Sequence, residues 1–359
     1  MSGPRDDASI TLLPQRLTEF VRQIFSALGC EAMEAETVAH FLVDSNLAGH
    51  ESHGVVRIPR YIGYVRDGQV RLNQHGSVAI DTGSAVVIDG NAGFGQAICK
   101  AAVALGIDRA TALGVATVGV RNTGHVGRVG AWAEMAAARG LVSLHFVNSP
   151  GRGGIQVAPA GARERRVAPN PIAIGIPRSE GAPFLLDITS AVIPEGKVLV
   201  ALNRGDRLPE GAAIDADGRP TRDPKAYYGP PPGALLPIGA HKGFGLCMAI
   251  DLLAGALTQG GCSDPRRTLF GNNMFSIYID PATMGSASYL AQAASDLCAW
   301  VRSAAPIARD GEILAPGDME ARTRAHRLAH GVPLDAATWR SICESAASLG
   351  VQPPLPASA

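Results

Sequence analysis

The chain has 359 residues, of which 46 % are hydrophobic and 18 % are charged. This apolar share is enough for a sizeable core and excludes a chain that is disordered throughout. Its 32 Lys and Arg residues balance 32 Asp and Glu residues, so the net charge is zero. Neither nucleic acid nor an anionic membrane is therefore expected as a partner.

The sequence also predicts the compartment. No stretch reaches the roughly 18 uninterrupted apolar residues that a membrane helix needs, and the first residues lack the pattern of a secretory signal. The six cysteines are scattered, with no C-x-x-C pair. This distribution is typical of reduced thiols in a cytoplasmic protein and does not indicate a structural metal site.

The residue pattern predicts helices at both ends of the chain and an alternation of strands and helices between them. Near the start, one apolar stripe has helical spacing and would end at Gly29; it consists of Leu17, Phe20, Val21, Ile24, Phe25 and Leu28. A second helix is expected over residues 31–47. Strands are expected at 85–89, 115–120, 141–147, 172–176, 184–188 and 274–279, and helices at 96–113, 130–139 and 244–257.

The remaining segments are less regular. Residues 203–239 are rich in Gly, Pro and Asp, and we expect them to form a long ordered loop. After about residue 285 the tail returns to helix and ends in a helix over 335–349.

The usual phosphate-binding motifs are missing. A G-x-G-x-x-G fingerprint does not occur, and neither does G-x-x-x-x-G-K-[ST]. The sequence also lacks a G-x-S-x-G elbow and an H-E-x-x-H pair. A Rossmann-type or P-loop nucleotide site is therefore not predicted.

The densest polar cluster spans residues 46–54 and contains an H-x-x-H pair, His50 and His53. A metal site would need a third ligand at a known spacing. His53 and Arg57 lie four positions apart, so they would share one face if this stretch were helical. An imidazole beside a guanidinium suits a small 2-oxo or 2-hydroxy acid, because Arg can hold the carboxylate while His transfers the proton. A capped helix end with solvated charges remains the alternative.

Four further clusters have chemical potential but weaker motifs. The Gly-rich turn at 120–130 precedes a helix and suits either phosphate binding or tight packing. Asp187 follows an apolar strand and could bind ribose hydroxyls or cap a helix. Lys242 at a Gly-flanked helix start favours an anion. The segment 315–320, followed by several arginines, is compatible with an exposed loop that leads into a solvated helix.

These five clusters, in this order, resemble the malate/L-lactate dehydrogenase family, whose fold is typified by sulfolactate dehydrogenase. The resemblance extends from about residue 20 to 351. It rests on residues 46–54, 127–130 with Trp132 and Glu134, Asn170-Pro171, 241–243, Pro316-Gly317 and 331–335 with Trp339. The family binds NAD or NADP without a Rossmann fold, which accounts for the missing fingerprint.

The resemblance implies an α+β fold with a large mixed, mostly antiparallel sheet and a helical domain formed by both chain ends. The expected boundaries are residues 1–75 plus 285–359 for the helical domain and 76–284 for the α/β cofactor-binding domain. The family also implies a homodimer with active sites near the subunit interface, and a small carboxylic acid as the substrate.

Site residues follow from the same resemblance, position by position. His53 matches the general acid/base, Ser52 its support and Arg57 the group that holds the substrate carboxylate, while His125 competes with His53 for proton transfer. The positions expected to contact the cofactor are His53, Gly127, Arg128, Val129, Leu185, Leu186, Asp187, Ile188, Thr189, His241, Lys242, Asn272, Gly317, Asp318, Met319 and Glu320.

The leading hypothesis is an NAD(P)-dependent oxidoreductase that transfers a hydride between nicotinamide and C2 of a small 2-hydroxy or 2-oxo acid. NAD is the first choice, although the sequence does not decide between NAD and NADP. A reductase of a cyclic imino acid of the piperideine-2-carboxylate type is the alternative. A cofactor-binding protein without catalysis is a third reading, against which Ser52, His53 and Arg57 argue. Pro169 and Glu195 depart from the family pattern and would alter substrate preference if they line the pocket.

Overall fold

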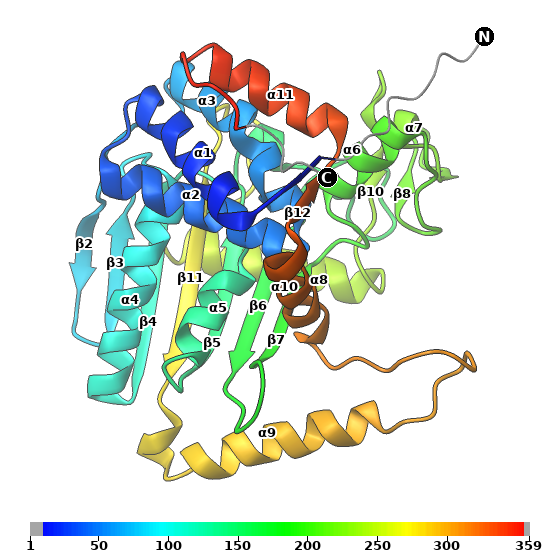
Figure 1. Cartoon of the computed structure of the whole chain (residues 1–359). Coiled ribbons are helices and arrows are strands. Elements are labelled where there is room, and N and C mark those ends of the chain that lie inside the picture. The colour runs from blue at the N-terminus through cyan, green and yellow to red at the C-terminus, as the bar shows by residue number, and fades with distance from the viewer. Residues whose placement is uncertain (1–9, 355–359) are drawn as a thin grey trace.

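The computed structural model describes residues 10–354, and a seven-stranded sheet forms its centre (Figure 1). The strand order is β2-β3-β4-β11-β5-β6-β7. Only β3 and β4 pair in parallel, and every other neighbouring pair is antiparallel. The strands are β2 (Ser77–Asp81), β3 (Ala85–Asp89), β4 (Val115–Thr123), β5 (Val142–Asn148), β6 (Pro171–Ile176), β7 (Phe184–Thr189) and β11 (Asn272–Ile279). The predicted mixed, mostly antiparallel, non-Rossmann sheet is confirmed.

One face of this sheet is covered by α4 (Gly95–Leu113) and α5 (Gly130–Ala137), as Figure 1 shows. Their apolar side chains and those of the strands form one continuous core. Trp132 of α5 is fully buried there, with its ring centroid 4.6 Å from that of Phe41 on α2 (Ala32–Leu47). These elements match the predicted strands and helices to within a few residues at each end.

The other face carries α8 (His241–Ile250), which continues into a π-helix, η4 (Asp251–Ala256). The prediction of one regular helix over 244–257 is therefore wrong in its second half. The buried Asp251 carboxylate accepts hydrogen bonds from Asn148 Nδ2 at 2.7 Å and from Ser263 N at 2.9 Å. The wider turn lets the chain hold this buried carboxylate against β5, which the hydrophobic spacing could not indicate.

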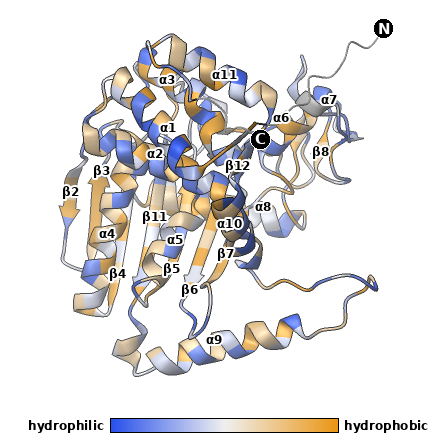
Figure 2. Ribbon diagram, in the orientation of Figure 1, coloured by the Kyte–Doolittle hydropathy of each residue, from blue (hydrophilic) through white to orange (hydrophobic). Residues whose placement is uncertain are grey.

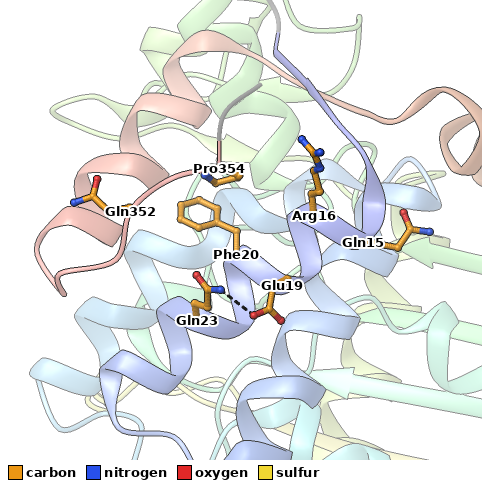
Figure 3. Close-up of a pocket in the computed structure, with 7 residues that line it drawn as sticks. All are labelled: Gln15, Arg16, Glu19, Phe20, Gln23, Gln352 and Pro354. Atoms are coloured by element: carbon orange, nitrogen blue, oxygen red, sulfur yellow. Dashed lines mark hydrogen bonds between the residues drawn. The ribbon is translucent and has the colours of Figure 1, made fainter. Parts of the chain in front are cut away.

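Both chain ends meet above the sheet. Helices α1 (Pro14–Leu28), α2, α3 (Ile58–Arg66) and α11 (Ala336–Ala347) share one apolar cluster. Strands β1 (Ile10–Leu12) and β12 (Val332–Leu334) pair antiparallel and join the two ends. These three-residue strands were not predicted, since so short a run carries no period. Between α1 and the last described residues lies a pocket of about 480 Å³, where Phe20 and Pro354 face each other (Figure 3).

The tail adds two further helices. Helix α9 (Ala287–Arg302) runs along the lower end of the sheet in Figure 1. It is attached to the β6–β7 connection, where Ser179 N donates to Ala291 O at 3.0 Å. Helix α10 (Asp318–His330) returns to α2, and Figure 2 shows that it is mainly hydrophilic. The 3₁₀ turn η5 (Pro281–Met284) precedes α9, and another short 3₁₀ turn, η3 (Arg152–Gly154), follows β5.

The Gly- and Pro-rich excursion is ordered, as expected. It begins at the end of α6 (Glu195–Arg204) and contains β8 (Ala213–Ile214), β9 (Pro220–Thr221), α7 (Pro224–Tyr228) and β10 (Ala234–Leu235). The strands form a small sheet in the order β10-β8-β9, and the segment shares an apolar cluster with α6 and neighbouring parts of the chain. The Arg165 guanidinium lies 4.3 Å from the centre of the Tyr227 ring and fixes the excursion to the body.

Within residues 10–354, no helix has both the length and the apolar character required to cross a bilayer.

Candidate active site

The segment that follows α2 carries three of the predicted catalytic residues. It forms two 3₁₀ turns, η1 (Glu51–His53) and η2 (Val55–Arg57), separated by an extended Gly54. We expected His53 and Arg57 to share one face if this stretch were helical, but the stretch is not one continuous helix. Asn46 shapes the break, because its Oδ1 accepts a hydrogen bond from Val55 N at 2.8 Å. The chain folds back instead, so that Arg57 Nε donates to Ser52 O at 2.5 Å.

The two competing histidines lie side by side. The rings of His53 and His125 are stacked, with centroids 5.3 Å apart and planes inclined by 28°. Ser52 Oγ is 3.0 Å from His53 Nδ1. His125 comes from the loop after β4, about 70 residues further along the chain. The fold thus brings Ser52, His53, Arg57 and His125 into one group, as their shared predicted role requires.

His125 is held by Gly127 of the predicted site and by two residues outside it. Its Nδ1 lies 2.7 Å from Tyr61 Oη, and Gly127 N donates to the same nitrogen at 3.3 Å. Gln96 Nε2 donates to Tyr61 Oη at 2.7 Å from a fully buried position on α4. The sequence motifs assigned no role to Tyr61 or Gln96. An amide on the buried side of an otherwise apolar helix was the available signal, because such a group needs a partner.

Burial controls the electrostatics of this group. Removal from water lowers the pKa of both His53 and His125 well below the usual value for histidine, and the nearby Arg57 guanidinium lowers it further. Burial also lowers the pKa of Arg57, but Tyr61 and Glu195 oppose that change. Both imidazoles are therefore neutral near pH 7 before a ligand binds. Each remains partly open to solvent, so a ligand can reach it.

Three of the predicted cofactor segments also meet. Gly130 N, at the end of the turn formed by Gly127, Arg128 and Val129, donates to Asp187 Oδ2 at 2.9 Å. Leu185 N donates to Pro316 O at 3.2 Å. Gly317 has φ +96°, and a Cβ added to it would lie 2.8 Å from Pro183 O. This turn therefore requires glycine, and it lets the residues that begin α10 approach β7 closely.

Arg128 differs most from its expected role. Its side chain is buried and forms ion pairs with Glu134 at 2.6 Å and Asp44 at 3.2 Å. Arg324 of α10 pairs with the same two carboxylates. This ion-pair cluster ties α2, α5 and α10 together. Among the described residues, Arg128 Nε and Nη1 have no hydrogen-bond partner, so part of the guanidinium could still serve a ligand at the turn.

The first residues of α10 are placed beside the catalytic segment. Glu320 Oε1 lies 3.1 Å from His50 Nε2, three residues before His53. Asp318 instead pairs with Arg302 at 2.5 Å, and Met319 is largely exposed. On β7, Leu185 is buried while Leu186 and Ile188 are partly exposed, and Thr189 Oγ1 donates to Pro169 O at 2.9 Å.

The remaining predicted cofactor residues make different contacts. His241 and Lys242 are exposed at the start of α8, and within residues 10–354 their side chains form no hydrogen bond or ion pair with the other segments. Asn272 is buried, and its amide bridges Val126 N at 3.1 Å and Asn148 O at 3.0 Å. It thereby supports the loop that carries His125. No group of three or more His, Cys, Asp or Glu residues within positions 10–354 is arranged to hold a metal ion.

Comparison with known families identifies the class of this molecule. The family model described as malate/L-lactate dehydrogenase matches residues 13–343, most of the chain. The chain belongs to the malate/L-lactate dehydrogenase family. The resemblance read from its motifs is thus confirmed.

Individual relatives of this dehydrogenase agree with that assignment. It is 39 % identical to hydroxycarboxylate dehydrogenase B of Escherichia coli (strain K12), over 98 % of this chain and 96 % of that one. It is 34 % identical to a Δ1-pyrroline-2-carboxylate/Δ1-piperideine-2-carboxylate reductase of Pseudomonas syringae pv. tomato, over 95 % and 98 % of the two chains. The structure of sulfolactate dehydrogenase from Methanocaldococcus jannaschii superposes with a TM-score of 0.84 at 29 % identity, covering 96 % of this chain and 98 % of that chain.

The family assignment makes this protein an oxidoreductase of the hydroxy-acid class. It also gives context to aromatic residues that the motif search passed over. The rings of Tyr64 and Phe270 stack with centroids 4.4 Å apart, and the centroid of the Phe270 ring is 6.4 Å from that of His125. They form an apolar wall next to the histidines. Two aromatic residues far apart in sequence give no pattern, so only the fold could reveal this wall.

Proposed function

We propose that this dehydrogenase uses NAD or NADP to interconvert a small 2-hydroxy acid and the corresponding 2-oxo acid. The observation that supports it best is that Ser52, His53, Arg57 and His125 converge beside the turn at 127–130, where Gly127 N donates to His125 Nδ1 and Gly130 N donates to Asp187 of β7. A nicotinamide cofactor, when bound, supplies or accepts the hydride at C2 of the substrate. The protein's own residues then have to bind the carboxylate, orient C2 and move one proton.

The hydrogen bonds favour His53 for the proton. Because Gly127 N–H donates to His125 Nδ1, neutral His125 carries its proton on Nε2 and can only donate there. His53 Nδ1 faces the Ser52 hydroxyl, which can accept a hydrogen bond as well as donate one. His53 can therefore present an unprotonated Nε2 to the substrate hydroxyl. In this assignment His53 removes the hydroxyl proton during oxidation, and His125 donates a hydrogen bond to the substrate oxygen.

Arg57 would hold the substrate carboxylate. It is oriented by its bond to Ser52 O, so the same residue fixes both the anchor and the base. Arg128, Asp187 and the residues that begin α10 would hold the cofactor, since a buried guanidinium with unused nitrogens and a close glycine turn suit a phosphate or a ribose. Lys242 would add a positive charge at the start of α8, beside His241.

The test is a screen at 340 nm of NADH and NADPH against 2-oxo acids and one cyclic imino acid. Oxidation of the reduced cofactor with a 2-oxo acid is the expected result and fixes cofactor preference at the same time. Activity with the cyclic imine alone would favour the alternative activity, which the 34 % identical reductase supports. Lack of turnover with the whole panel, despite NADH binding, would refute both.

We further propose that the protein works as a homodimer. The face of the sheet opposite α4 and α5 leaves large apolar side chains open, with Leu252 55 % and Leu257 57 % exposed beside α8. Trp300 on α9 is 72 % exposed. Exposed apolar side chains in such number are typical of interfaces. Light scattering should give twice the chain mass of 37.2 kDa, and a mass of one chain at micromolar concentration would refute this.

A further inference from the structure

The first residues of α6 approach the catalytic segment closely. A Cβ added to Gly196 would lie 2.5 Å from Ser52 Cβ, so the backbone of α6 rests directly on the serine that bonds His53. Glu195 is the residue before this contact and the first of the helix. Glu195 is partly exposed to solvent. Neither the family match nor the predicted roles assign Glu195 a function.

Glu195 does not project freely. Tyr228 Oη donates to Glu195 Oε1 at 2.9 Å. Tyr228 ends α7 in the Gly- and Pro-rich excursion and packs against its apolar cluster. Its neighbour Tyr227 is buried in that cluster beneath the Arg165 guanidinium. The excursion therefore acts as a rigid support that holds one carboxylate near Ser52 and Arg57.

The charge of Glu195 acts on the substrate-binding groups. Its negative field opposes the lowering of the Arg57 pKa and contributes to the raised pKa of Tyr64 and of Tyr228. The Arg60 charge also acts on Arg57 and His125, but Arg60 is exposed, so solvent screens its charge. The contacts of the backbone place Glu195 near the same groups: Gly196, the next residue, rests on Ser52, whose carbonyl oxygen accepts the hydrogen bond from Arg57. After one substrate carboxylate has bound Arg57, a second anionic group would meet Glu195.

We propose that Glu195, positioned by Tyr228, is a specificity-determining residue that excludes substrates with a second anionic group. This inference rests on the proposed function and narrows its substrate class to 2-oxo acids with one carboxylate and a neutral remainder. The reason is electrostatic: a like charge held in a partly desolvated site weakens binding by about tenfold or more. A neutral hydrogen-bonding group at the same place meets no such repulsion.

The sharpest test compares two substrates of nearly equal shape in the unmodified protein. Oxaloacetate and its 4-amide, 2-oxosuccinamate, differ at the distal end by one charge. We expect the amide to have at least about a tenfold higher kcat/KM. Equal values for the two, or a preference for oxaloacetate, would overturn the inference. Lack of turnover with any 2-oxo acid would instead refute the proposed function.

Variants then assign the effect to the residue. In Glu195→Gln the preference for the amide should fall to within about threefold, because the charge is gone while the shape remains. Tyr228→Phe keeps the Glu195 charge but removes the hydrogen bond that positions it, and should reduce the preference for the amide only in part. The matched control is Glu210→Gln, an exposed carboxylate of the same excursion, which should leave the preference unchanged. An unaltered preference in a Glu195→Gln protein that still binds NADH would overturn the assignment. If Glu195→Gln does not fold, the Tyr228→Phe result decides, and no change in preference there would count against it.

Discussion

Replacing His53 by alanine tests the central assignment of the proposed mechanism. The change removes the proposed base and leaves Arg57 and the Tyr61–His125 pair in place, since none of their hydrogen bonds uses the His53 ring. Removal of a general base typically costs a factor of about 10² to 10⁴, or roughly 3–5 kcal/mol of transition-state stabilisation. Because His53 is only partly buried, the cavity is open to water and the free energy of unfolding should change little.

The assay measures kcat/KM for 2-oxo acid reduction from pH 5 to 9, together with NADH binding by fluorescence. Reduction needs a protonated His53, whose pKa burial and Arg57 lower, so the unmodified enzyme should lose activity as the pH rises from the acid side. His53→Ala should abolish both the activity and this pH dependence while NADH still binds. His125→Ala should be slower but keep the pH dependence. Near-normal turnover of His53→Ala would refute this assignment and give the proton-transfer role to His125.

Three further outcomes follow from the structure. Burial lowers the pKa of His145 to about 3, so below the unfolded value near 6.5 the unfolded chain binds more protons than the folded chain. The free energy of unfolding should therefore fall by about 2–3 kcal/mol between pH 6.5 and 4.5. Urea titrations in which His145→Gln shows the same loss would contradict this. Arg128→Met leaves two carboxylates without this partner and should cost about 3–5 kcal/mol in thermal unfolding, whereas the exposed Arg166→Met should cost under about 0.5. Gly196→Ala would push a methyl group into the catalytic serine and should lower kcat/KM by about tenfold or more, while Gly63→Ala, which meets no atom within 4 Å, should not; equal activities of the two variants would refute the close contact.

The periodic elements were predictable because each one buries a face whose spacing is visible in the sequence. The stripe at Leu17 to Leu28 and the strand at 85–89 lie where the pattern placed them. The prediction failed where a buried polar group, not an apolar face, determines the backbone. The π-helix at Asp251 and the break at Gly54 are both set by hydrogen bonds to distant residues. Such bonds leave no period in the sequence.

The candidate site shows the same division. Its motifs are recognisable in order, so the sequence alone predicts Ser52, His53, Arg57 and His125 as site residues. The residues that support this group were not predicted. Gln96 and Tyr228 are single residues within ordinary-looking segments, and each matters only because the fold brings it to a partner tens of residues away.

Composition and ordered motifs by themselves determined the class of fold, the family and the group of reactive side chains. Tertiary structure alone decided which nitrogen of each histidine is engaged, that much of the Arg128 side chain forms a structural ion-pair cluster, and that Gly196, the residue after Glu195, rests on Ser52. The physical reason is that an apolar period is a local property, whereas a hydrogen bond or a Coulomb interaction depends on the distance between atoms. That distance is fixed only when the whole chain has folded.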